Sequence, residues 1–275
     1  MSETPRVRLE ASGPVARITL ARPEVRNAFD DVLIAELTRA ARGLSDAFEI
    51  AAATGDGAWP APAPRVAVLT GEGAAFCAGA DLNWMRRSVA YTRDENEADA
   101  QRMAAMIRAI DELPMPVIAR VNGPALGGGM GLLSACDIAI AAEGALFGFT
   151  EVRLGIAPAV ISSFVLPKIG AAAARRYFLT GETFGADAAR AMGLVHAVVP
   201  APRLDAEVDA VAQAVLACGP RAVAAAKRLI REATVRTRDD ALENAVRVIA
   251  ALRASPEGQE GLGAFLEKRR PSWRR

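Results

Sequence analysis

The sequence has little of several residue types on which common catalytic and binding sites depend. Its 275 residues contain a single histidine, His196, and three widely separated cysteines, Cys77, Cys136 and Cys218. One histidine excludes a metal site built on two or more histidines of one chain, and it disfavours a Ser-His-Asp triad. An odd number of cysteines set among apolar neighbours favours reduced, packed side chains. We therefore predict no metal site and interpret His196 and the three cysteines as structural.

Excess charge of one sign and long apolar runs are also missing. Lys and Arg number 33 against 32 Asp and Glu, which leaves a formal net charge of +1. This balance provides no general field for nucleic acid or an anionic membrane. No stretch approaches the roughly 18 apolar residues of a membrane span, and the polar residues 1–8 lead into no apolar signal segment. We expect a cytoplasmic protein that binds neither nucleic acid nor membrane.

The glycine-rich segments do not have the spacing of nucleotide-binding loops. Neither residues 71–73 nor residues 127–129 continue into G-x-G-x-x-G, and no G-x-x-x-x-G-K-[ST] occurs. The G-x-S-x-G elbow of many hydrolases is absent as well. Dinucleotide and P-loop chemistry therefore lack their phosphate cradle, and an elbow-type serine nucleophile is not indicated.

The elements that the sequence does indicate alternate between strands and helices. Apolar patterning predicts strands over residues 15–20, 65–70, 117–121 and 137–141, and a further strand near Ala145. It predicts helices over about 30–48, over a charged stretch ending near Leu113, and over 127–135, with a surface loop over 55–64. From Leu204 onward the chain reads as wholly helical. We expect an α/β core over residues 1–200 and a helical region over residues 201–275, divided near Pro200.

Two glycine-rich and alanine-rich segments have the composition of an anion-binding backbone. The first is Ala75-Phe-Cys-Ala-Gly-Ala-Asp-Leu82, and the second is Asn122-Gly-Pro-Ala-Leu-Gly-Gly-Gly-Met-Gly131. The small residues around Gly79 allow a ligand to approach the main chain closely, and glycines at a helix start leave N–H groups unpaired at its positive end. Such segments can form an oxyanion hole, although a single glycine run also suits a simple tight turn.

A third segment, Phe147-Gly-Phe-Thr-Glu-Val-Arg-Leu-Gly-Ile-Ala-Pro158, places a carboxylate in mostly apolar surroundings. Burial raises the pKa of a carboxyl group toward the range that suits acid–base catalysis. Glu151 is therefore a candidate for proton transfer, and an ion pair with Arg153 or another basic group is the alternative.

Together the three segments resemble, in order and spacing, the crotonase (enoyl-CoA hydratase/isomerase) family. The resemblance covers about Val15 to Pro200, and the ending Phe265-Leu-Glu-Lys-Arg-Arg-Pro-Ser-Trp273 is similar to the terminal helix of that family. It implies the crotonase spiral of repeated ββα units, followed by helices that join chains into a homotrimer or homohexamer. The implied substrate is an acyl-CoA thioester, with no metal or redox cofactor.

The resemblance also implies a role for individual residues. The amides of Ala80 and Gly128 would hold the thioester oxygen as negative charge develops, and Glu151 would move a proton. Phe265 and Lys268 would reach the nucleotide end of CoA from an adjacent subunit. The complete set of residues implied to contact substrate or CoA is Val25, Arg26, Ala28, Ala78, Gly79, Asp81, Leu82, Gly127, Gly131, Phe265 and Lys268.

One position departs from the pattern of many hydratases in the family. They carry a second glutamate three residues after the middle glycine of the run, where this chain has Gly131. Two carboxylates can hold one water between them, whereas a single carboxylate is sufficient to carry a proton between the α and γ carbons. Three readings follow: a hydratase, a Δ3-Δ2-enoyl-CoA isomerase, or a CoA-binding protein without turnover.

Among hydratases the chain most resembles the methylglutaconyl-CoA group, which implies a branched, carboxylated acyl chain. Such a substrate would need a cation, for which Arg86, Arg87 and Arg153 are candidates by their place in the sequence. Trp84 and Met85 follow the first segment, where they could form a wall of the acyl site or pack in the core.

Overall fold

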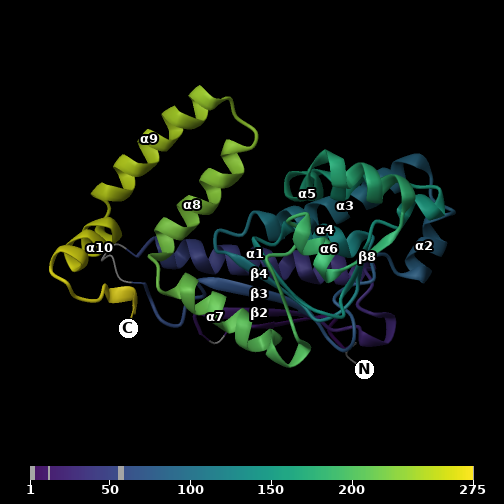
Figure 1. Ribbon diagram of the computed structural model, residues 1–275, viewed down its shortest axis with the longest axis horizontal. Helices are drawn as coiled ribbons and strands as arrows, with labels where there is room; N and C mark the ends of the chain where they lie inside the picture. The colour runs from purple at the N-terminus through teal and green to yellow at the C-terminus, as the bar shows by residue number, and fades with distance from the viewer. Residues whose placement is uncertain (1–3, 12, 55–58, 275) are drawn as a thin grey trace.

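A computed structural model describes residues 4–11, 13–54 and 59–274 (Figure 1). Residues 55–58 of the predicted surface loop lie outside the described residues. The strands are β1 (Val7–Glu10), β2 (Val15–Leu20), β3 (Val66–Gly71), β4 (Val117–Val121), β5 (Ala125–Leu126), β6 (Ile138–Ala142), β7 (Leu146–Gly148), β8 (Thr183–Gly185) and β9 (Ala197–Val199). The α-helices are α1 (Asp31–Ala52), α2 (Leu82–Ser88), α3 (Arg93–Asp111), α4 (Gly128–Ala135), α5 (Ala159–Thr180), α6 (Ala186–Ala191), α7 (Leu204–Leu216), α8 (Pro220–Ala233), α9 (Arg238–Ala254) and α10 (Pro256–Leu266).

The strands form two sheets. Six of them lie in the order β1-β2-β3-β4-β6-β9, in which β1 and β2 are antiparallel and the later neighbours are parallel. A second sheet has the order β5-β7-β8. Parallel strands are joined by crossovers that contain helices, so the loops leaving their carboxyl ends gather at one edge.

Both faces of the larger sheet are covered. Alternate residues of β3 enter different cores: Ala67 and Leu69 pack in the large cluster with α1, α3, α4 and α5, whereas Val66 and Val68 pack with α7. Strand β3 is therefore buried along its whole length, as expected for a central parallel strand. Figure 1 shows α1 and α7 on opposite sides of the sheet.

The C-terminal helices lie at the end of the molecule opposite α2 (Figure 1). Helix α8 is fixed to the core by Lys227, whose Nζ lies 2.7 Å from Asp137 Oδ2 and also bonds to the carbonyl of Met115. The predicted helical region from Leu204 onward is confirmed. Helix α7 packs on the sheet of the α/β core. That the chain consists of two units divided near residue 200 therefore stays a prediction. No single helix among the described residues is long and apolar enough to cross a membrane, although α7 and α8 pass that test as a pair bent by 104°.

Several details differ from the sequence-based expectations. The charged stretch ending near Leu113 is two helices, α2 and α3, because Thr92 caps α3 in a reciprocal box with Glu95. Cys77 and Cys136 are buried as predicted, but the packing prediction for Cys218 is wrong because this residue is exposed near the end of α7. His196 is structural as predicted: its Nδ1 accepts a hydrogen bond from the amide of Ala139 in β6 at 3.0 Å.

Candidate active site

The first glycine-rich segment runs from β3 to α2 and passes close to the start of α4. Gly79 has a φ of +88°, and a Cβ on this residue would lie 3.2 Å from the amide nitrogen of Gly128 and 2.8 Å from the carbonyl of Leu126. Only a glycine fits both the conformation and this close approach. Two segments about 50 residues apart in sequence thereby meet at the next residue, Ala80.

Among the described residues, the amides of Ala80 and Gly128 donate to no backbone carbonyl. Ala80 forms a bridge with Phe29, but the bonds of this bridge run from Phe29 N to Gly79 O and from Asp81 N to Phe29 O. The amide of Ala80 therefore takes no part in it. Gly128 is the first residue of α4, where N–H groups have no acceptor within the helix. Both residues line the same cavity.

Glu151 begins the short 3₁₀ helix Glu151–Leu154 and points toward the second segment. A Cβ on Gly127 would lie 3.6 Å from Glu151 Oε1, so the carboxylate stands next to the start of α4. Its Oε2 is buried and has no hydrogen-bond partner within the described residues. Burial raises the pKa of Glu151, opposed in part by a bond from its own backbone amide. No basic side chain among the described residues contributes to the pKa shift of Glu151, which disfavours the alternative of an ion pair with Arg153 or another basic group.

Ala80, Gly128 and Glu151 share a cavity of about 310 Å³. Apolar walls come from Phe29, Met103 and the start of α5, including Val160 and Ile161. Trp84 and Met85 also line it, and Trp84 packs in the large core cluster as well, so both predicted alternatives stay open. Two amide donors, one base and a small apolar chamber can together polarise a carbonyl and move a proton at a neighbouring carbon.

Asp81 and Leu82, predicted to contact substrate, do not line this cavity. Asp81 caps α2: its Oδ1 accepts from the amides of Asn83 at 2.7 Å and Trp84 at 3.2 Å. Burial opposes its ionisation, yet these amides and Arg22 hold the pKa of Asp81 below its usual value. Leu82 is exposed on the outer side of α2. Ala78 is half-buried, and its amide bonds to the carbonyl of Arg26.

The early loop lies against the first glycine-rich segment through that same bond. Val25 is half-buried, Arg26 is exposed with a left-handed φ of 54°, and Ala28 is buried. Phe265 and Lys268 lie at the far end of the molecule, with α10, and within one chain they are distant from α2 (Figure 1). Their predicted contact with CoA of an adjacent subunit stays a prediction.

Two residues that hold the site together were missed in the sequence. The guanidinium of Arg22 lies 3.0 Å from both Asp30 Oδ2 and Asp81 Oδ2, and it donates to the carbonyl of Ala28. Asn27, fully buried, donates from Nδ2 to the carbonyls of Glu72 and Ala75. A polar side chain before Pro23 and another in the loop after it were the only signal, because Asp81 lies 59 residues from Arg22 and Glu72 lies 45 residues from Asn27.

Gly131 faces a packed wall. A Cβ at this position would lie 2.4 Å from Ile161 Cγ2 and 2.9 Å from Ile107 Cδ1. A second carboxylate cannot stand at residue 131 unless Ile161, which also lines the cavity, changes its position. The site therefore has a hydrophobic surface where a paired carboxylate could otherwise be.

The arginines proposed to bind a carboxylated acyl group lie elsewhere. Arg87 pairs with Asp31 on the surface, and Arg86 bonds to Asn83 within α2. Arg153 packs beside Gly181. Among the described residues that line the cavity there is no lysine or arginine.

Comparison with known proteins agrees with this geometry. Residues 10–275 match the family model described as enoyl-CoA hydratase/isomerase. The chain is 33% identical over 267 residues to a crotonyl-CoA hydratase of Syntrophomonas wolfei, with 96% of each chain covered. It is 32% identical over 262 residues to a 2,3-dehydroadipyl-CoA hydratase of Escherichia coli, covering 94% of this chain and 95% of the relative. The crystal structure of an enoyl-CoA hydratase from Shewanella pealeana superposes with a TM-score of 0.88 at 36% identity, covering 98% of this chain and 96% of that one.

Proposed function

The chain belongs to the enoyl-CoA hydratase/isomerase family and is an enzyme with the crotonase fold, and we propose that it adds water to the double bond of an α,β-unsaturated acyl-CoA thioester. The observation that carries this proposal is the convergence of Ala80, Gly128 and Glu151 on one cavity. Relatives named as hydratases, at about one-third identity over nearly the whole chain, support it.

In the proposed reaction the thioester oxygen accepts bonds from the amides of Ala80 and Gly128. Glu151 takes a proton from water as the hydroxide adds to C3, and the electron pair of the double bond moves onto the thioester oxygen as an enolate. The enolate then takes the proton back from Glu151 at C2. Each preorganised donor at the oxyanion is typically worth about 3 kcal/mol of transition-state stabilisation. Coenzyme A is part of the substrate, and no step requires another cofactor.

Isomerisation of a 3-enoyl-CoA to the 2-enoyl isomer is the second candidate. Gly131 favours it, because Ile161 occupies the space beside this glycine and leaves Glu151 as the base. One carboxylate can remove a proton from C2 and return it to C4 through the same enolate.

Which acyl group the substrate carries is a separate question. A methylglutaconyl group remains among the substrates to test, but the cavity offers no arginine or lysine among its described lining residues. The two named relatives act on acyl groups with different ends, one neutral and one carboxylated, at nearly equal identity to this chain. Overall similarity therefore does not select the acyl group, and the lining of the cavity is the better guide.

The proposal is tested with three thioesters and one variant. Crotonyl-CoA, 3-hexenoyl-CoA and 3-methylglutaconyl-CoA are incubated with the enzyme, and absorbance and product mass are followed. Addition of 18 Da to crotonyl-CoA supports hydration, whereas conversion of 3-hexenoyl-CoA without a change in mass supports isomerisation. No change in absorbance or product mass with any of the three thioesters would favour a binding protein without turnover.

Glu151→Gln keeps the shape of the side chain but removes the base. We expect turnover to fall by about 10²–10⁴-fold while the affinity for CoA thioesters stays nearly unchanged. Turnover equal to that of the wild type would remove Glu151 from the mechanism.

A further inference from the structure

Part of the wall of the cavity is polar, although Met85, Ala100 and Met103 also line it there. This part is formed by α2 and α3 and presents Trp84 and Ser88 from the first helix, and Asn96 and Asp99 from the second. Ser88 is seven residues after Asp81, the N-cap of α2. This spacing places Ser88 about 10 Å along the helix from the first glycine-rich segment. Ile107 of α3 lies beside Gly131 of α4. Asp99 is eight residues before Ile107, so it lies about 12 Å from that point along α3. This polar wall therefore faces the far end of an acyl chain.

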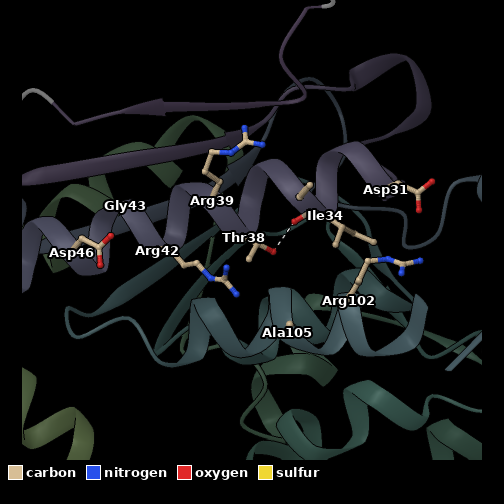
Figure 2. A pocket seen from close by; sticks show the side chains of 10 residues that line it. Asp31, Ile34, Thr38, Arg39, Arg42, Gly43, Asp46, Arg102 and Ala105 are labelled. Atoms are coloured by element: carbon tan, nitrogen blue, oxygen red, sulfur yellow. Dashed lines mark hydrogen bonds between the residues drawn. The ribbon is translucent and has the colours of Figure 1, made fainter. Parts of the chain in front are cut away.

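Asp99 presents its carboxylate to the cavity and its counter-ion to the outside. The residue is only 7% exposed, and its Oδ1 lies 2.7 Å from Arg102 Nη2. Arg102 extends into the separate groove between α1 and α3, which Asp31 and Thr38 also line (Figure 2). A ligand in the acyl cavity therefore lies nearer to the carboxylate of Asp99 than to the guanidinium.

The remaining polar atoms of this wall are mostly acceptors. Asn96 uses its Nδ2 on the carbonyls of Tyr91 and Thr92, which leaves its amide oxygen available. Ser88 donates its hydroxyl proton to the carbonyl of Met85, so its lone pairs remain. Trp84 lies beside these oxygens, and its Nε1 is buried without a partner within the described residues.

A hydroxyl group matches these acceptors, because it donates to a carboxylate or amide oxygen. A second carboxylate would be repelled by Asp99, whose charge is balanced only by the exposed Arg102, and a methyl group would place apolar surface against these oxygens. We infer that the preferred substrate is an enoyl-CoA whose acyl chain carries a hydroxyl group at the end distant from the thioester. This inference rests on the proposed function, since it concerns the acyl chain of the same site.

The test compares 2-enoyl-CoA thioesters of six and eight carbons whose chains end in a hydroxyl, a methyl or a carboxylate group. We expect kcat/KM for the hydroxyl chain to exceed that for the methyl chain of matched length by about 10-fold. The carboxylate chain should be poorer than the methyl chain by about 10-fold or more. Equal values for the three ends, or preference for the methyl or carboxylate end, would overturn the inference.

Two substitutions at Asp99 separate its charge from its hydrogen bonds. Asp99→Asn should improve kcat/KM for the carboxylate chain about 10-fold while keeping part of the preference for hydroxyl. Asp99→Leu should abolish that preference. Asp94→Asn removes the same charge from an exposed position of α3 outside the cavity lining, and it should leave the order of substrates unchanged. If both Asp99 variants keep the wild-type order of substrates, the polar wall does not determine the preference among chain ends, and the inference is overturned.

Binding of unreactive, saturated acyl-CoA thioesters distinguishes failure of this inference from failure of the proposed function. Calorimetry with ω-hydroxyacyl-CoA and alkanoyl-CoA of matched length measures the acyl pocket without turnover. If no enoyl-CoA is hydrated but the hydroxyl chain still binds about 10-fold tighter, the function is wrong and the selectivity holds. If hydration proceeds while the two analogues bind equally, the selectivity is wrong and the function holds.

Discussion

At the scale of single residues, Glu151 combines a buried oxygen without a partner among the described residues and a raised pKa caused by that burial. The base is active only when ionised, so we predict that kcat/KM declines as the pH falls through this raised pKa, above the ordinary value of 4.5. A pH–rate profile measured with subsaturating crotonyl-CoA checks this prediction. An acid limb centred at or below the ordinary value would contradict it.

The same burial has a consequence for stability. A carboxyl group whose pKa is higher in the folded state binds more protons there, so its contribution is present below the unfolded pKa and is lost as the pH rises through the folded one. We predict that Glu151→Gln, which avoids ionisation, has a higher Tm than the wild type at pH 7. The difference should shrink as the pH falls toward 4.5, the ordinary value. Thermal unfolding of both proteins across this range measures it, and a Gln variant that is less stable at neutral pH would refute the explanation.

Arg22 is the residue whose removal should damage the site most without touching substrate. Its side chain is 12% exposed and pairs with two buried carboxylates, those of Asp30 and Asp81. Arg22→Met should lower the free energy of unfolding by about 3 kcal/mol, since a buried charge loses its partner. Arg8→Met is a matched control, because Arg8 and Glu72 form an exposed pair and the loss should stay below about 1 kcal/mol. Urea unfolding measures the free energy of unfolding of both variants. Equal decreases in the two would show that Arg22 contributes no more to stability than an exposed ion pair.

The catalytic candidates could be proposed from the sequence because their chemistry is local: glycine beside glycine, and a carboxylate within an apolar segment. Arg22 and Asn27 could not, since an arginine and an asparagine in a loop are ordinary until their distant partners are known: Asp81, 59 residues from Arg22, and Glu72, 45 residues from Asn27. Asp99 was missed for a related reason. It lies in a charged helical stretch, and nothing in that stretch marks which of its acidic residues faces a cavity.

At the scale of elements, the strand-to-helix segments are held together by backbone proximity. Gly79 and Gly155 both have a left-handed φ, +88° and +75°, but a methyl group would meet neighbours within 4 Å only at Gly79. We predict that Gly79→Ala abolishes activity because the methyl group would separate the segments that carry Ala80 and Gly128. Gly155→Ala should cost about 1 kcal/mol of stability through φ strain alone and keep most activity. Turnover and Tm of both variants decide the matter; an active Gly79→Ala enzyme would contradict the close approach.

The sequence predicted most elements because buried strands and helix caps leave strong local patterns. It did not resolve the break between α2 and α3, which depends on the Thr92 and Glu95 cap. It also passed over α5, which contains Pro167 and a left-handed Gly170 that interrupt its helical pattern. Such interruptions are tolerated because neighbouring helices pack around them, and that packing is not visible in a local pattern.

At the scale of the whole molecule, α9 presents an apolar stripe that the described part of the chain leaves uncovered. Leu242, Val246 and Ile249 follow helical spacing and are 63%, 59% and 46% exposed. We propose that a second copy of the chain covers them, within a trimer or hexamer. Val246→Arg should shift the protein toward the monomer in light scattering after size exclusion, whereas Arg247→Ala beside it, in a surface ion pair, should not. A wild-type protein that is monomeric at micromolar concentration would contradict this assembly.

The packing beside Gly131 also bears on how such an enzyme could change over evolutionary time. Acquiring glutamate at this position first would force it against Ile161 and Ile107, whereas trimming Ile161 first would leave a void in the chamber. Each single step should therefore lower the free energy of unfolding, through overpacking in one order and a cavity in the other. A second carboxylate at this position is accordingly best introduced together with a smaller residue at position 161.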